Sequence, residues 1–205
     1  MERKNNYQIQ ANQAKACFLT YDQAALIRKL GLRHDDQYLY TTLLCREYRI
    51  CRHSGDLQRL CAGVWERADS FEEIMTLLDL VCDSREDRFP SNRWKNMRDF
   101  GLMFHRNLLE ENTDPWAVYF QNNAGAFREA CISLGGEKQR QGDIAYALEL
   151  FDGLRVVPQL WFGDEEFPPN LRFLWDENAL MYIRYETMYF AKTLLLQRIR
   201  EIMEQ

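Results

Sequence analysis

Three consecutive acidic residues, Asp164, Glu165 and Glu166, could do chemistry if their carboxylates converge. In an extended chain Asp164 and Glu166 point to the same side, with their backbone positions about 7 Å apart. Two such carboxylates could share a hard cation such as magnesium. With Asp143 or Asp176 folded nearby, they could also supply a general acid and a general base. The acidic run therefore allows a carboxylate site, which is one of two interpretations.

The other interpretation is a solvated turn between two strands. In it the first strand ends at Gly163, the acids face water and Phe167 packs back into the core. Pro168-Pro169 then keeps the exit from the turn extended. Connections between strands run over the surface and are rich in polar side chains, so this interpretation is favoured over the catalytic one.

Two tryptophans, Trp161 and Trp175, flank the acidic run. They could line a ligand cleft, because aromatic side chains often line pockets. At alternating strand positions, packing in the core or on a sheet face is favoured instead. The candidate binding residues are therefore Trp161, Asp164, Glu165, Glu166, Trp175 and Asp176.

The remaining sequence offers no familiar catalytic motif. None of the three histidines, His34, His53 and His105, falls in a pattern such as H-E-x-x-H. Cys51 precedes His53 by two residues and would share a strand face with it, which makes a weak thiolate pair. The chain has no G-x-S-x-G elbow and no G-x-G-x-x-G or G-K-[ST] loop. Catalytic residues stay unassigned, and the sequence predicts no metal site and no cofactor.

Composition restricts the partners. The 205 residues are 46% hydrophobic and 28% charged, as in globular proteins. The net charge is -5, with bases and acids interleaved as in SREDR (84–88), so nucleic acid is not expected. No apolar run approaches the roughly 20 residues that span a bilayer, and the polar start MERKNNYQIQ does not resemble a secretory signal. We therefore expect a cytoplasmic protein with no membrane partner; a homo-oligomer or a protein partner stays possible.

The six cysteines are scattered along the chain, without any C-x-x-C pair. Cysteine metal sites usually use pairs of ligands that are close in the sequence, and disulfides are rare in cytosolic proteins. The prediction is therefore reduced, buried thiols at Cys17, Cys45, Cys51, Cys61, Cys82 and Cys131.

The first third of the chain predicts two helices and then strands. Apolar residues at helical spacing from Tyr7 to Phe18 indicate an opening helix. Thr20 and Gln23 resemble a capping box before a second helix that stops at Gly31. The segment 37–57 is rich in Tyr, Thr, Leu and Ile and contains a Ser-Gly-Asp turn, which indicates two or three short strands in hairpins.

The middle of the chain predicts three helices. Ser70 and Glu73 form a capping box ahead of an apolar stripe that ends near Asp83. Ser91 or Asn92 would cap a second helix, with a face of Trp94, Met97, Gly101, Phe104 and Leu108. Asp114-Pro115 starts a third, whose stripe of Trp116, Phe120, Ala124, Phe127, Cys131 and Leu134 continues to Gly135-Gly136.

The last third predicts a hairpin, a further strand and a helix. Alternation from Ile144 to Leu150, the pair Asp152-Gly153 and the returning segment 156–162 indicate a hairpin with one buried face. Pro158 requires a bulge or an edge there, because proline cannot donate to the ladder. The segment LRFLW (171–175) adds a strand, and a helix runs from about Tyr185 to the end.

Strands in local hairpins, separated by groups of helices, favour an α+β fold with helices packed on an antiparallel sheet. We expect a single domain over residues 1–205, built from segments 6–57, 70–134 and 143–205. The last helix carries a wide apolar stripe that could bind a partner, although such stripes more often cover the protein's own sheet. Its residues are Met181, Tyr185, Met188, Tyr189, Leu195 and Leu196.

The stretch LWFGDEEFPPNLRFLWD (160–176) resembles the C-terminal signature of a prokaryotic family, domain of unknown function 3786. The resemblance lies in Trp161, Asp164 to Pro168, and Leu174 to Asp176, and LCREYRICRHSGDL (44–57) is similar to the family's early strand pair. It spans about residues 20 to 200, with a partial match at RFPSNRWKNMRDFGLMF (88–104). The family implies no settled activity. Some longer relatives add a cysteine-rich segment similar to iron–sulfur domains, which this sequence does not contain.

The sequence therefore favours an accessory or ligand-binding domain that has no recognisable catalytic motif. One alternative is a carboxylate- or metal-dependent hydrolase that uses Asp164 to Glu166. Another is a protein–protein interaction or assembly module. Exposed acids without a common pocket would favour the first hypothesis, whereas a cleft joining two of them to Asp176 would favour the enzyme.

Overall fold

The computed structural model describes residues 2–100 and 114–205, with side chains from residue 6 onward. The fold is α+β, as predicted, and contains two antiparallel sheets of five strands each among these residues. The chain forms two compact units. Unit 1 comprises residues 1–88 and 180–194, and unit 2 comprises residues 89–179 and 195–205. The single domain stays a prediction.

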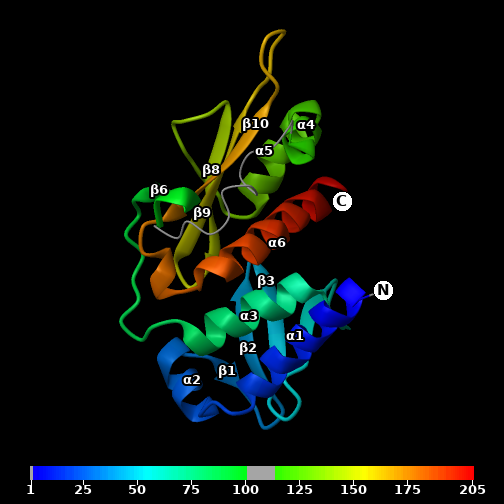
Figure 1. Cartoon of the computed structure of the whole chain (residues 1–205), viewed down its shortest axis with the longest axis vertical. Coiled ribbons are helices and arrows are strands. Elements are labelled where there is room, and N and C mark those ends of the chain that lie inside the picture. Colours follow the sequence, from blue (N-terminus) through cyan, green and yellow to red (C-terminus); the bar gives the residue numbers. More distant parts are fainter. Residues whose placement is uncertain (1, 101–113) are drawn as a thin grey trace. The chain divides into compact units, whose positions relative to one another are not determined.

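Unit 1 begins with α1 (Glu2–Phe18) and α2 (Gln23–Leu30). Its sheet follows chain order through β1 (Arg33–His34), β2 (Tyr38–Leu43), β3 (Arg46–Cys51), β4 (Leu57–Cys61) and β5 (Val64–Arg67), and α3 (Phe71–Asp83) follows. α1 packs along α3 (Figure 1). The ring of Phe71 joins these helices to the last one, because it lies 4.8 Å from Tyr7 and 4.9 Å from Phe190.

The sheet of unit 1 has one core face and one more exposed face. Leu39, Leu43, Tyr48, Ile50 and Leu57 are buried, whereas the residues that alternate with them are half-buried or exposed. This is the pattern that period-two alternation predicts for a sheet covered on one side.

The helix ends of unit 1 confirm two predictions and correct one. Gly31 ends α2 with φ 60°, a left-handed conformation that glycine adopts without strain. Ser70 caps α3 by accepting the N–H of Glu73. The cap of α2, however, is Asp22, whose carboxylate accepts the N–H groups of Ala24 and Ala25. The Thr20–Gln23 capping box was therefore wrong; Thr20 instead donates its hydroxyl to the carbonyl of Cys17.

Unit 2 holds a sheet in the order β6-β10-β9-β8-β7. Its elements are β6 (Trp94–Asn96), the 3-10 turn η1 (Met97–Phe100), α4 (Pro115–Asn122), α5 (Ala124–Ser133), β7 (Glu137–Lys138), β8 (Ile144–Phe151), β9 (Leu154–Trp161) and β10 (Asn170–Asp176). α4 packs on β9 and β10, and α5 packs on β8. The stacked rings of Phe120 and Phe127, 4.4 Å apart, join the two helices.

The predicted helix after Ser91 is wrong where it can be compared. Trp94 to Asn96 form an edge strand that pairs with β10, and Ser91 and Asn92 bind a carboxylate on β10. A half-buried tryptophan covers a sheet as readily as it lines a helix, so spacing alone misassigned it. The part of that prediction at Gly101, Phe104 and Leu108 lies outside the described residues.

The third predicted helix begins at Asp114-Pro115 as expected, with Asp114 accepting the N–H of Trp116. It is two helices instead of one. Asn123, at φ -123° and ψ 37°, interrupts the helical backbone between α4 and α5. The apolar stripe continues across this break, so the sequence pattern did not reveal it.

β8 and β9 form the predicted hairpin. Asp152 (φ 48°) and Gly153 (φ 84°) both have positive φ, as a type I′ turn requires. Both faces are buried, which corrects the prediction of one buried face, because Ala145, Ala147 and Val157 form a second core cluster with Trp94 and Leu174.

Pro158 lies in a central strand, since β9 stands between β8 and β10. The pairs Ala145↔Gln159 and Leu148↔Val156 bracket the proline, and on its other side Pro158 pairs with Phe173. The missing N–H falls in a gap of the β8–β9 ladder. The register is the same on both sides of this gap, and the register shift of this pair lies between Glu149 and Phe151, so the bulge or edge predicted at Pro158 is wrong.

α6 (Tyr185–Met203) follows the short turn η3 (Ala179–Met181) and confirms the predicted final helix. Four residues of its apolar stripe, Tyr185, Met188, Leu195 and Leu196, are buried within the chain. None of the helices in residues 2–100 and 114–205 is long and apolar enough to cross a membrane.

The cysteines are free, as expected, but only Cys131 is buried. Cys17 and Cys45 are exposed and the other three are half-buried, so the predicted burial is wrong for five of the six. Burial raises the pKa of the Cys131 thiol to about 12, which makes this side chain an inert part of the core.

Candidate functional site

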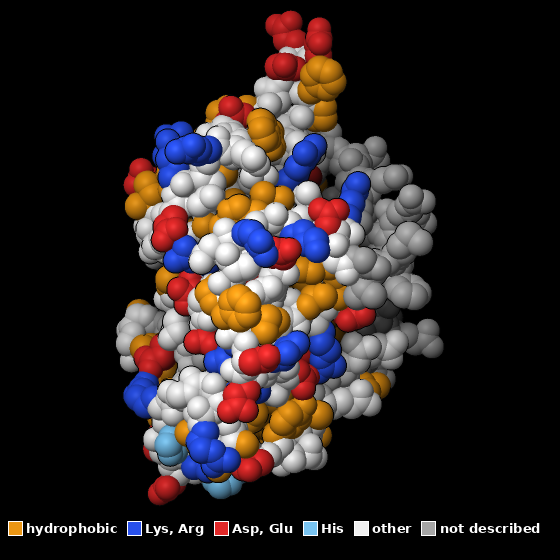
Figure 2. Space-filling view, turned by 90° about the vertical axis from the view of Figure 1, so that its left-hand side faces the viewer, with side chains coloured by type: hydrophobic (Ala, Val, Ile, Leu, Met, Phe, Trp, Pro, Cys, Tyr) orange, Lys and Arg blue, Asp and Glu red, His pale blue; other side chains and the backbone are white. Residues whose placement is uncertain are grey.

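The acidic run lies at the end of the β9–β10 hairpin, which projects beyond the rest of its sheet (Figure 1). Asp164, Glu165 and Glu166 are all exposed. Figure 2 shows acidic side chains gathered at this projecting end. We call residues 161–169 the acidic tip.

Three aromatic side chains of the acidic tip are exposed with the acids. Trp161, Phe162 and Phe167 have 42%, 45% and 67% of their surface accessible. The expected return of Phe167 into the core is therefore wrong, and Trp161, the last residue of β9, does not lie in the core. The tip presents large apolar surface beside three carboxylates.

Two side chains from other elements anchor the base of the tip. The backbone N–H of Phe162 donates to Asp143 (2.7 Å), and that of Gly163 donates to Gln121 on α4 (2.6 Å). A β-carbon on Gly163 would lie 2.6 Å from the backbone nitrogen of Pro169, so only glycine fits this close approach.

Asp164 orders the rest of the turn. Its carboxylate accepts the N–H groups of Glu166 (2.9 Å) and Phe167 (2.8 Å), and its own N–H donates to the carbonyl of Phe167. The donated N–H of Phe167 and then that of Glu166 hold the pKa of Asp164 below its usual value. The tip is thus a preformed turn whose first acid is used internally.

The other two candidate residues lie at the far end of β10. Trp175 and Asp176 are completely buried. β10 runs from Asn170, beside the tip, to Asp176, which is about 20 Å at roughly 3.3 Å per residue. The structure therefore does not bring Asp176 or Trp175 together with the acidic tip.

Asp176 is a clamp for two loops. Its carboxylate accepts the N–H of Ser91 (3.0 Å), the hydroxyl of Ser91 (2.9 Å), the N–H of Asn92 (2.7 Å) and the N–H of Asn178 (2.8 Å). A buried carboxylate is tolerated only where such donors replace water. These four hydrogen bonds fix the segment before β6, at Ser91 and Asn92, and the turn after β10, at Asn178.

A hollow that the sequence did not single out lies between α5 and the loop before β8. Its volume is about 490 Å³. Arg128, Lys138 and Arg140 line it, with Asp143 as its acid and Tyr146 in its wall. We call these five residues the cationic hollow. Its members are dispersed between 128 and 146 among polar neighbours, so only the fold brings them together.

The electrostatics of the cationic hollow are unbalanced. Its lining carries three positive charges and one negative charge. The Asp143 carboxylate already accepts the N–H of Phe162. Within the part of the chain that the structure describes, the side chains of Arg128, Lys138 and Arg140 form no hydrogen bond or ion pair. Concave, positively charged surface with unused donors is suited to an anion.

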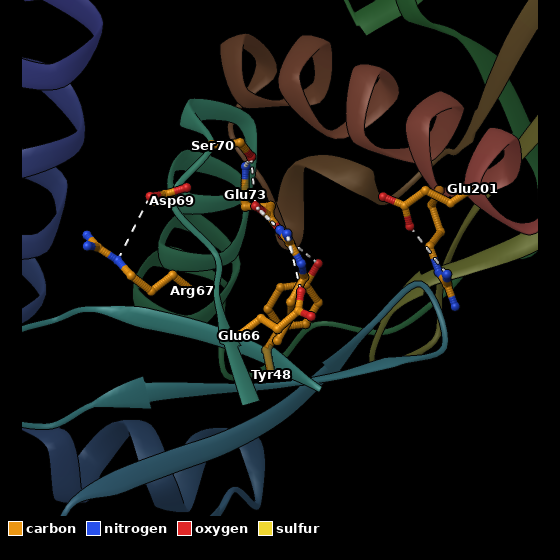
Figure 3. A network of polar contacts seen from close by, with 9 residues as sticks. Tyr48, Glu66, Arg67, Asp69, Ser70, Glu73 and Glu201 are labelled. Carbon is orange, nitrogen blue, oxygen red and sulfur yellow. Dashed lines mark hydrogen bonds and ion pairs between the residues drawn. The ribbon is translucent and has the colours of Figure 1, made fainter. Parts of the chain in front are cut away.

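A buried carboxylate in unit 1 has a structural role. Arg59 donates to both carboxylate oxygens of Glu73 (2.8 and 2.9 Å). The hydroxyls of Tyr48 (3.1 Å) and Ser70 (2.9 Å) also donate to this carboxylate. Figure 3 shows Tyr48, Ser70 and Glu73 turned toward one another. Burial first, and then the Glu73 charge, raises the pKa of Tyr48. Every partner in this cluster is satisfied.

Within the described residues, the Cys51 thiol and the His53 ring form no hydrogen bond with each other. Burial raises the pKa of the Cys51 thiol, but donors from the Ser54 hydroxyl and from the backbone of His53 and Ser54 outweigh it, so the pKa is below its usual value. His53 contributes its backbone and its ring is exposed. Among the residues described, no group of three or more His, Cys, Asp or Glu side chains could hold a metal ion.

Comparison with known proteins gives one match. Searches of curated proteins and of solved structures found no significant similarity. The model of a protein family described as "Domain of unknown function (DUF3786)" matches residues 22–198, which include both the acidic tip and the cationic hollow. The chain therefore belongs to the DUF3786 family, a domain of unknown function.

Proposed function

We propose that this protein is a binding domain that takes a small anionic ligand, bearing phosphate or carboxylate groups, in the cationic hollow. The observation that carries the proposal is the set of three basic side chains, Arg128, Lys138 and Arg140, around one concave surface with unused donors. A volume of about 490 Å³ lies within the usual range for small-molecule sites, roughly 300–1,000 Å³.

The hydrolase alternative has less support. It needs carboxylates that meet, but the Asp164 carboxylate is used by its own turn and Asp176 lies about 20 Å along β10. Glu165 and Glu166 remain exposed at the tip. This placement favours presentation of the acids to a partner over their use on a substrate held between them.

Isothermal titration calorimetry with inorganic pyrophosphate and with citrate tests the proposal. We expect binding that weakens as salt rises, because exposed charges are screened beyond a Debye length of about 10 Å at 0.1 M. Each single change, Arg128→Ala, Lys138→Ala or Arg140→Ala, should weaken binding about 10-fold, the low end for a charge-assisted hydrogen bond.

The matched controls are Arg67→Ala on β5 and Arg172→Ala on β10, which remove the same charge from residues that do not line the cationic hollow. They should leave both affinities unchanged. Absence of binding by both probes, or equal binding by the triple variant of the hollow, would overturn the proposal.

A further inference from the structure

The acidic tip has the properties of a docking element. Trp161, Phe162 and Phe167 expose their apolar rings to solvent. Exposed apolar patches of this kind usually mark an interaction surface. The turn is fixed by Asp164, Gln121 and Asp143 before any partner arrives, so little conformational entropy remains to be lost on binding.

The complementary surface is on the same chain. The acidic tip carries three carboxylates, and the cationic hollow carries three basic side chains against one acid. The two lie at the same end of the sheet, because Ile144 pairs with Leu160 and the N–H of Asp143 donates to the carbonyl of Leu160.

A tip cannot readily enter the hollow of its own chain. Its base is anchored at Phe162 and Gly163, and the β9–β10 ladder continues to the pair Asn170↔Trp161. The hairpin therefore projects in line with its strands, away from the sheet (Figure 1). Since tip and hollow share one end of unit 2, a two-fold axis at that end lets two copies exchange tips in a closed, isologous contact.

We propose that the partner of the cationic hollow is the acidic tip of a second copy of this chain, which forms a two-fold dimer. The inference rests on the proposed function, because it uses the same anion-binding hollow. In the dimer, Glu165 and Glu166 of one copy contact Arg128 and Arg140 of the other. The exposed rings cover the surrounding surface, which supplies affinity that exposed ion pairs alone do not give.

Sedimentation velocity over micromolar to submillimolar concentrations tests the dimer. The tip variant Glu165→Lys/Glu166→Lys leaves the Asp164 turn intact, and the hollow variant is Arg128→Glu/Arg140→Glu. Each variant alone should dimerise at least 10-fold more weakly than the natural sequence. The control Glu72→Lys/Glu186→Lys makes the same charge change on helices of unit 1 and should dimerise at least as well.

Mixing the two variants gives the decisive measurement. In a mixed dimer each reversed tip meets a reversed hollow and each natural tip meets a natural hollow, so association should return to nearly the original strength. A monomer at all concentrations, or a mixture that associates no better than its components, would overturn the proposal.

Pyrophosphate titrated into the tip variant separates this inference from the proposed function. That variant retains the natural hollow. If it binds pyrophosphate while the natural chain stays monomeric, the hollow is an anion site and the dimer is refuted. If the natural chain dimerises and the mixture is rescued without pyrophosphate binding, the tip is the ligand and the small-anion function is refuted.

Discussion

Asp164 and Asp176 carry the same carboxylate and both accept backbone N–H groups, yet they have opposite roles. Asp176 is completely buried and binds two loops through four hydrogen bonds. Asp164 is exposed and arranges only its own turn, leaving Glu165 and Glu166 in solvent. The comparison teaches that proximity of acids in a sequence does not predict a common site, because one strand separates their environments by about 20 Å.

The largest expected effect is at Asp176. Asp176→Ala removes the fully buried carboxylate that accepts three part-buried backbone N–H groups and the Ser91 hydroxyl, so we expect a loss of about 3–5 kcal/mol in the free energy of unfolding. Urea denaturation measures it. Asp176→Asn keeps part of the acceptor capacity and should lose less. If Asp176→Ala unfolds at the same urea concentration as Asp164→Ala, the contrast between the two aspartates is lost.

Glu73 extends the comparison to a second buried carboxylate. Glu73→Ala removes the acceptor for Arg59, Tyr48 and Ser70, and the remaining Arg59 charge is only partly exposed. We expect a loss of about 2–4 kcal/mol, below that at Asp176 because Arg59 can reach solvent or Glu66. Urea denaturation of Glu73→Ala beside Glu72→Ala, its half-buried neighbour on α3, gives the control.

Gly163 tests how rigid the exposed region is. Gly163→Ala places a β-carbon against the backbone of Pro169, so the base of the tip must shift, at a cost of about 1–3 kcal/mol. Gly125→Ala in α5, where a β-carbon meets nothing within 4 Å, should be neutral or slightly stabilising. Equal stability of the two variants would show that the tip adapts.

The smallest effect is the titration of Asp164. Because its folded pKa lies below the ordinary 3.8, its contribution to stability is present above that value and is lost as pH falls through the folded pKa. In nuclear magnetic resonance titrations, the amide signals of Glu166 and Phe167 should shift with a midpoint below 3.8. A midpoint at or above 3.8 would contradict the hydrogen-bonded turn.

Element types were largely predictable because they depend on local signals. Ser70, Gly31, Asp114 and the Asp152-Gly153 pair each mark a boundary through backbone chemistry that the residue itself supplies. The edge strand at Trp94 was not predictable, because it forms only through pairing with β10, far along the chain. Long-range strand pairing thus determined the secondary structure at Trp94, which the spacing of apolar residues could not determine.

The candidate site was predictable only in part. The exposed acids followed from their place after a strand, but Phe167 was expected inside and lies outside. The cationic hollow depends on α5 and the loop before β8 meeting in space, and no short motif encodes that. Between residues 128 and 146 the three bases stand among three acids, Glu129, Glu137 and Asp143, so no charge excess marks this stretch in the sequence.

The interleaved order of the two units has a consequence for biosynthesis. Unit 1 needs Arg184, whose N–H and guanidinium satisfy the buried Asp79 carboxylate of α3, and this residue is translated about a hundred residues after α3. At roughly 5–20 residues per second, the ribosome adds the intervening segment in about 5–20 s. During that interval the nascent first segment lacks its counter-charge, so unit 1 cannot be completed until Arg184 has been translated.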